Sequence, residues 1–275
     1  MNDIRLIALD LDGTLLNSNK ELTARNEAAL RAAAEKGIYI VPTTGRFFTA
    51  MPAVIRELPY LRYAITINGA AVYDIAAQQD IVRAELPLSQ ALAIMEYLDT
   101  LPVFYDCYMD NRGWMTKALQ DQAADYAPDV HYLNMIRNLR TPVPELKAFI
   151  RERGMDIQKI QFFMTDMELR ARLLKELPER FENLSVSSSV VNNIEINSFH
   201  ANKGEAVLAL AKHLGLSREQ TMAFGDGLND LSMIEASGVG VAMANAVPTV
   251  LAAADRVTLS CDEDGVAALI EELCL

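Results

Sequence analysis

The sequence has few residues of the types that form disulfides or transition-metal sites. Its 275 residues include three cysteines and three histidines. The cysteines (Cys107, Cys261 and Cys274) are far apart and form no CxxC pair, which favours neither a disulfide framework nor a zinc site. The histidines lack metal-ligand spacing as well. We therefore interpret all six as ordinary surface or partly buried side chains.

Long apolar runs and basic clusters are also missing. No run approaches the roughly 18 apolar residues that a membrane helix needs, so we expect no membrane partner. The first residues, MNDIRLIALDLDGT, contain aspartates where a signal peptide would have an uninterrupted apolar run. We therefore expect a cytoplasmic protein. The net charge is −12 without a Lys/Arg cluster, so we expect no nucleic-acid partner. A phosphate site in so acidic a chain needs local positive charge, and a cation could supply it.

Apolar runs alternate with helical patterns at both ends of the chain. Strands are predicted at Ile4–Leu9, Ile38–Val41 and Tyr63–Ile67, with helices at Leu22–Lys36 and Phe47–Leu58 between them. The alternation returns from Lys203 onwards. This order predicts an α/β fold, with a doubly wound, Rossmann-like parallel sheet as the core.

The middle of the chain breaks this rhythm with mixed short strands and helices, and it carries no nucleophile or phosphate-loop motif. We therefore predict a core of residues 1–83 and 193–275 and an inserted α/β cap of residues 84–192. Hinges are expected near Arg83–Pro87 and Asn192–Asn197. Polar cap residues should contact the substrate, and the candidates are Tyr105, Tyr108, Arg112, Trp114 and His131.

Four polar segments lie at strand ends or open a helix in the predicted core: Asp10–Thr14, Thr43–Arg46, Asn202–Gly204 and Gly225–Asp230. Ligands of doubly wound sheets bind where the carboxyl ends of the strands meet. Each segment alone is a common turn or helix start. Four such segments in this order indicate a single site.

The residue types in these segments suit phosphoryl transfer. Asp10, Asp12 and Asp226 would crowd one site, a cost that a cation relieves, and hard oxygen ligands favour Mg²⁺. A carboxylate such as Asp10 can attack phosphorus, while Asp12 can protonate the leaving group and later activate water. Lys203 and the Thr44 hydroxyl can hold the phosphoryl oxygens.

With these residues identified, the chain resembles the haloacid dehalogenase superfamily of phosphohydrolases, in its Cof-type branch (subfamily IIB). The resemblance rests on DLDGTLLN, TTGR, NGA at Asn68–Ala70, NKG, GDGLNDLSMI and the terminal DEDGVA. It covers the core, about 160 residues by this division of the chain. The inserted segment fits that branch's cap by position and size alone.

The resemblance implies a role for each matching residue. Asp10 corresponds to the nucleophile and Asp12 to the acid/base. The implied Mg²⁺ ligands are Asp10, the backbone carbonyl of Asp12, and Asp226, and Asp230 is a supporting acid near the metal or Lys203. The implied phosphate contacts are Leu11 through its backbone, Thr44, Gly45, Lys203 and Asn229.

The expected activity is magnesium-dependent hydrolysis of small phosphorylated metabolites, such as sugar phosphates, through an aspartyl-phosphate. Dehalogenases of the superfamily lack the second aspartate, so Asp12 argues for phosphate. A phosphomutase shares all these motifs and remains an alternative. A sensor that only binds phosphorylated ligands is a second alternative.

Overall fold

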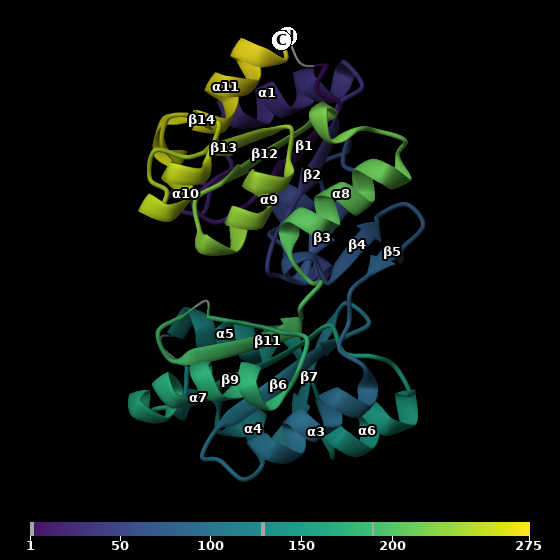
Figure 1. Ribbon diagram of the computed structural model, residues 1–275, viewed down its shortest axis with the longest axis vertical. Helices are drawn as coiled ribbons and strands as arrows, with labels where there is room; N and C mark the ends of the chain where they lie inside the picture. Colours follow the sequence, from purple (N-terminus) through teal and green to yellow (C-terminus); the bar gives the residue numbers. More distant parts are fainter. Residues whose placement is uncertain (1–2, 128–129, 189) are drawn as a thin grey trace. The chain divides into compact units, whose positions relative to one another are not determined.

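The computed structural model describes residues 3–127, 130–188 and 190–275, and the chain divides into two compact units. Unit 1 comprises Met1–Arg83 and Asn202–Leu275, and unit 2 comprises Ala84–Ala201. Both contain strands and helices (Figure 1). No helix in the described ranges is both long enough and apolar enough to cross a membrane.

The main sheet of unit 1 has five parallel strands in the order β14-β13-β12-β1-β2. This parallel sheet confirms the predicted α/β core. The strands are β1 (Leu6–Leu9), β2 (Tyr39–Pro42), β12 (Thr221–Gly225), β13 (Val239–Ala242) and β14 (Arg256–Val257). β1 is buried along its whole length between β12 and β2. The residues that follow these three strands therefore emerge side by side.

Helices cover both faces of this sheet because the apolar residues of β1 alternate between them. Ile7 and Leu9 belong to the core with α1 and α11, which lie side by side (Figure 1). Leu6 and Ala8 belong to the core with α8. The helices of unit 1 are α1 (Ala24–Glu35), α2 (Ala53–Arg56), α8 (Lys203–His213), α9 (Leu231–Ala236), α10 (Pro248–Ala253) and α11 (Gly265–Leu273).

The third predicted strand forms, but it lies in a different sheet from the one expected. β3 (Tyr63–Thr66) pairs antiparallel with β4 (Ala71–Asp74), which pairs with β5 (Gln79–Arg83). A turn at Ile67–Gly69 folds the chain back into this hairpin. An isolated parallel bridge between Thr43 and Ile65 links β3 to the residue after β2.

The helix predicted at Phe47–Leu58 is interrupted. It consists of a 3₁₀ turn at Phe48–Ala50 followed by the short α2. Pro52 stands between them, and proline has no N–H to continue a helix.

Unit 2 is built on a six-stranded mixed sheet in the order β10-β11-β9-β6-β7-β8. Helices α3, α6 and α7 pack on one face, while α4 and α5 pack on part of the other. The strands are β6 (Phe104–Met109), β7 (Arg112–Thr116), β8 (Arg140–Val143), β9 (Lys159–Phe163), β10 (Leu184–Ser187) and β11 (Asn193–Ser198). The helices are α3 (Leu88–Leu98), α4 (Lys117–Asp121), α5 (Val130–Leu139), α6 (Leu146–Arg153) and α7 (Met167–Arg180).

The second boundary between the units lies after Ala201, whereas the sequence placed it after Asn192. The reason is β11, which pairs with both β9 and β10. The hinge predicted at Asn192–Asn197 is therefore wrong, since most of that segment is a strand in the middle of a sheet.

Candidate active site

Three neighbouring strands of unit 1 deliver their following residues to one edge of the sheet. Asp10 comes directly after β1, and its backbone N–H donates to Phe224 O of β12 (3.1 Å). Thr43 comes after β2 and donates to Leu9 O (2.7 Å). Asp226 comes directly after β12. The structure thus brings together three segments that the sequence had assigned to a single site.

The fourth segment contributes Lys203, the first residue of α8. Its ammonium donates to Asp10 Oδ1 and to Asp230 Oδ1, both at 2.6 Å. The lysine side chain is fully buried. The Asn202 side chain caps α8 by accepting from the backbone N–H of Glu205 (2.8 Å), which fixes where the helix begins. A buried ion-paired lysine at a helix start therefore links Asp10 to the loop after β12.

Asp230 holds that loop in place. Its Oδ2 accepts from the backbone N–H groups of Asp226 and Gly227, each at 2.9 Å. Asp226 Oδ1 in turn accepts from the Thr14 hydroxyl (2.8 Å). Gly13 has φ +92°, and a Cβ there would lie 2.5 Å from Asp226 Oδ2. The two aspartate loops therefore approach as closely as they do because residue 13 has no side chain.

The acids of this cluster outnumber its lysine. One carboxylate oxygen from each of Asp10, Asp226 and Asp230 lies within 4.8 Å of the other two. Burial and the charge of Asp230 raise the pKa of Asp10 to about 7, against the opposing pull of Lys203. Burial alone would lower the pKa of Lys203, but Asp10 and Asp230 raise it above its usual value. The lysine is thus firmly cationic, and the three acids still carry excess negative charge.

Asp12 lies among a different set of partners. Arg46 Nη2 donates to both of its carboxylate oxygens (2.9 and 3.2 Å), and Lys20 Nζ lies 3.0 Å from Oδ1. Burial alone would raise the pKa of Asp12, but Arg46 and Lys20 outweigh it and hold the pKa below its usual value. Asp12 is therefore ionised in this arrangement.

The predicted phosphate contacts occupy the loops around Asp10. Thr44 is buried, and its hydroxyl accepts from the backbone N–H of Arg46 (3.2 Å). Gly45 follows it directly. The Leu11 side chain is fully buried, which leaves the backbone as the part of this residue suited to a ligand. Asn229 is exposed, and its amide lies 3.5 Å from Asn68 Oδ1.

Comparison with known proteins identifies the family. The profile of haloacid dehalogenase-like hydrolases matches residues 7–270. The chain belongs to this family. It is 32% identical to phosphatase YwpJ of Bacillus subtilis, across 98% of this chain and all of YwpJ. It is 31% identical to 5-amino-6-(5-phospho-D-ribitylamino)uracil phosphatase YcsE of the same organism, across 99% of this chain and 97% of YcsE.

Solved structures agree with the sequence matches. A haloacid dehalogenase-like hydrolase from B. subtilis is 32% identical and superposes with a TM-score of 0.79, covering 98% of this chain and all of that one. The resemblance to the haloacid dehalogenase superfamily is confirmed, and the protein is a phosphoric monoester hydrolase.

The donor set of this haloacid dehalogenase-like hydrolase fits a divalent cation. Asp10, Asp226 and Asp230 offer oxygen ligands, as Mg²⁺ prefers. Burial and the negative charge of Asp230 raise the pKa of Asp10, and a cation would offset that negative charge. Asp230 belongs to this group, although the family resemblance implied only a supporting role for it. The Asp12 side chain is not part of it, which is compatible with a role for the Asp12 backbone carbonyl.

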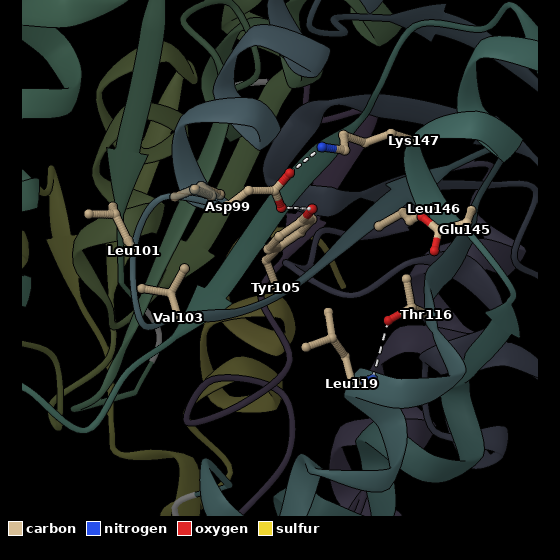
Figure 2. Close-up of a pocket in the computed structure, with 10 residues that line it drawn as sticks. Asp99, Leu101, Val103, Tyr105, Thr116, Leu119, Glu145, Leu146 and Lys147 are labelled. Atoms are coloured by element: carbon tan, nitrogen blue, oxygen red, sulfur yellow. Dashed lines mark hydrogen bonds and ion pairs between the residues drawn. The ribbon is translucent and has the colours of Figure 1, made fainter.

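The candidate cap residues do not form one cluster. Tyr105 lies in a cavity of about 320 Å³ in unit 2, with its hydroxyl donating to Asp99 Oδ1 (2.7 Å) beside Lys147 (Figure 2). Trp114 packs on Phe149. Tyr108 instead accepts from Arg140 Nη2 (2.7 Å).

Residue alternation explains why the two tyrosines separate. They stand three positions apart on β6 and so point to opposite faces of the sheet. Arg112 is exposed at the start of β7. The side chain of His131 lies outside the described residues.

Two basic residues of the site were not assigned by sequence reasoning. Arg46 is the last residue of TTGR, a motif that was recognised, but only Thr44 and Gly45 received roles. Lys20 lies in the turn that follows DLDGTLLN, with φ +65°. No motif in the sequence marks this position. Both residues form ion pairs with the Asp12 carboxylate.

Proposed function

We infer that this protein is a magnesium-dependent phosphatase of small phosphorylated metabolites, in particular sugar or sugar-alcohol phosphates, and that it acts through an aspartyl-phosphate on Asp10. The observation that carries this proposal is the buried contact of Lys203 with both Asp10 and Asp230 (2.6 Å each), beside Asp226. Such a group offers a nucleophile, a fixed positive charge and oxygen ligands within one cluster. Asp10, the Asp12 backbone carbonyl and Asp226 would hold the cation, supported by Asp230. When bound, Mg²⁺ supplies positive charge to the carboxylates and to the phosphoryl oxygens.

In the first step an Asp10 oxygen attacks phosphorus and the bond to the ester oxygen breaks. Lys203 orients Asp10 and offsets the charge that develops on the phosphoryl group. The departing oxygen takes a proton from Asp12, which yields the free alcohol. Backbone and side-chain donors at Leu11, Thr44, Gly45 and Asn229 hold the phosphoryl oxygens.

In the second step a water attacks the aspartyl-phosphate and gives its proton to Asp12. The bond between phosphorus and Asp10 breaks, which releases inorganic phosphate and restores the enzyme. The ion pairs of Asp12 with Arg46 and Lys20 favour the ionised form, which suits this base role. The acid role in the first step requires that substrate binding loosens these pairs.

Unit 2 is the proposed specificity domain, since the core motifs account for the chemistry of the phosphoryl group alone. The relative YcsE is named for a substrate with a phosphorylated ribityl group. This name supports a polyhydroxylated leaving group for the present enzyme. A panel of phosphorylated metabolites, assayed for free phosphate and for isomerised product, tests the assignment. Isomerisation with little phosphate release would favour a mutase, and binding without turnover would favour a sensor.

Metal removal is the first test of this proposal. Excess chelator should abolish hydrolysis of an aryl phosphate, and added Mg²⁺ should restore it, because the carboxylates otherwise retain their mutual repulsion. The measurement is phosphate release with and without chelator, with circular dichroism to show that the fold persists. Undiminished turnover in excess chelator would contradict the metal requirement.

Asp12→Asn should separate substrates by leaving group. The variant lacks the proton donor, so we expect a loss of about 10²–10⁴-fold in kcat/KM on an alkyl phosphate. The loss should be smaller on p-nitrophenyl phosphate, whose leaving group departs without a proton. The ratio of the two losses is the measurement. Equal losses on both substrates would remove the acid role from Asp12.

A further inference from the structure

A strained turn after β3 lies among the loops of the active site. Ile67, Asn68 and Gly69 follow one another with φ values of +55°, +56° and +95°. Positive φ is uncommon for any residue but glycine, and a β-branched residue such as Ile67 adopts it only under constraint. Strain of this kind persists where the surrounding structure holds it, and it clusters at functional sites.

The backbone of this turn is tied to the Thr44–Arg46 loop. The N–H of Asn68 donates to Thr44 O, and the N–H of Ile67 donates to Arg46 O, both at 3.0 Å. Ile67 is completely buried. The turn therefore fixes the loop that carries the Thr44 hydroxyl and the Arg46 partner of Asp12.

Its other side meets the start of α8. A Cβ on Gly69 would lie 2.2 Å from Asn202 O and 3.1 Å from the backbone nitrogen of Lys203. Gly69 is thus required both for its φ and for close approach to the helix that presents Lys203. Two of the four motif segments, Thr43–Arg46 and Asn202–Gly204, therefore pack against this turn.

The Asn68 side chain reaches a third motif segment, at Asn229, and contacts the Thr44–Arg46 loop again at Gly45. Its Oδ1 lies 3.5 Å from the amide nitrogen of Asn229. A Cβ on Gly45 would lie 2.9 Å from the same oxygen, so the amide group rests directly on that glycine. The αL conformation aims the amide this way, and asparagine tolerates it better than most residues.

We propose that Asn68 is a positioning residue of the phosphate site, which orients the Asn229 amide and the Thr44–Arg46 loop through its side chain. This inference rests on the proposed function, in which Asn229 and Gly45 contact the phosphoryl group. It assigns to the NGA segment a role that the chemistry of the core motifs leaves open.

The test uses Asn68→Gly, which removes the amide but permits the left-handed backbone. We expect kcat/KM for p-nitrophenyl phosphate to fall about 10-fold, with a matching rise in the inhibition constant of inorganic phosphate. The midpoint of thermal unfolding should stay near that of the parent. Asn68→Ala should show the same kinetic loss with lower stability, since alanine disfavours a positive φ.

A double-mutant cycle with Asn229→Ala identifies the route of the effect. Asn68→Gly should add little to Asn229→Ala, because both remove the same phosphate contact. Asn183→Gly is the matched control: Asn183 is exposed, has φ +58° and lies in unit 2, so its replacement should leave the kinetics unchanged.

Parent-like kinetics and phosphate inhibition in Asn68→Gly would overturn the inference and leave the turn with a backbone role alone. Fully additive effects in the cycle would also overturn it. A parent enzyme that releases phosphate from no substrate would instead contradict the proposed function, so the two failures are distinguishable.

Discussion

Asp10→Asn should lower kcat by a factor on the order of 10⁴–10⁶, the scale of loss when an enzyme's nucleophile is removed. The amide has almost the same volume as the carboxyl but cannot attack phosphorus. Lys203 keeps its contact with Asp230 in this variant, so we expect the fold to persist. Single-turnover measurements with radiolabelled substrate should detect no phosphorylated protein.

The control for this result is substrate binding. Burial and neighbouring acids raise the pKa of Asp10 in the parent, which means that its negative charge is already disfavoured there. Because that charge would repel the anionic phosphate, its removal in Asp10→Asn should not weaken phosphate affinity. Calorimetric titration of Asp10→Asn with inorganic phosphate checks this point. If the variant retains turnover within about tenfold of the parent, another group is the nucleophile and the aspartyl-phosphate route is wrong.

Lys203→Met should cost both stability and activity. The ammonium is fully buried between Asp10 and Asp230, and removing one partner of a buried ion pair costs about 3–5 kcal/mol. We expect kcat/KM to fall by about 10³-fold as well, because the charge that faces the phosphoryl group is lost. Urea unfolding and steady-state kinetics measure the two effects.

A compensating variant separates those effects. In Lys203→Met/Asp230→Asn one buried negative charge is removed together with the lysine, so part of the lost stability should return. Activity should not return, since the phosphoryl group still lacks the ammonium. Recovery of turnover in the double variant would mean that Lys203 serves the fold and not the reaction.

The core and its motif residues could be predicted because local and long-range signals coincide there. Ile4–Leu9 is an apolar run with an aspartate at its end, and a parallel sheet must place such residues at one edge. The same reasoning located Asp226 after β12 and Lys203 at the start of α8. Alternating strands and helices indicate a parallel sheet, and the strands of a parallel sheet all end at the same edge. This is why the side chains after the strands lie close together.

Other features depend on contacts that no local pattern encodes. β11 alternates Asn193, Glu195 and Asn197 with isoleucines, yet the segment was predicted to be a hinge where the chain crosses back to the core. Its polar residues are nevertheless buried, on the face of the sheet opposite to Ile194 and Ile196. The pairing of Asp12 with Arg46 joins two loops, and it became visible only when the loops were placed in space.

The insertion of unit 2 between residues 83 and 202 has a consequence for the order in which the protein is made. β1 pairs with β12, so the middle of the main sheet joins segments from opposite ends of the chain. The Thr14–Asp226 hydrogen bond spans 212 positions. During translation the chain of unit 2 emerges complete before β12, and domains generally fold as units as they leave the ribosome. The N-terminal segment with Asp10 must therefore wait, and the cluster of Asp10, Lys203, Asp226 and Asp230 can assemble only after the residues that follow β12 have emerged.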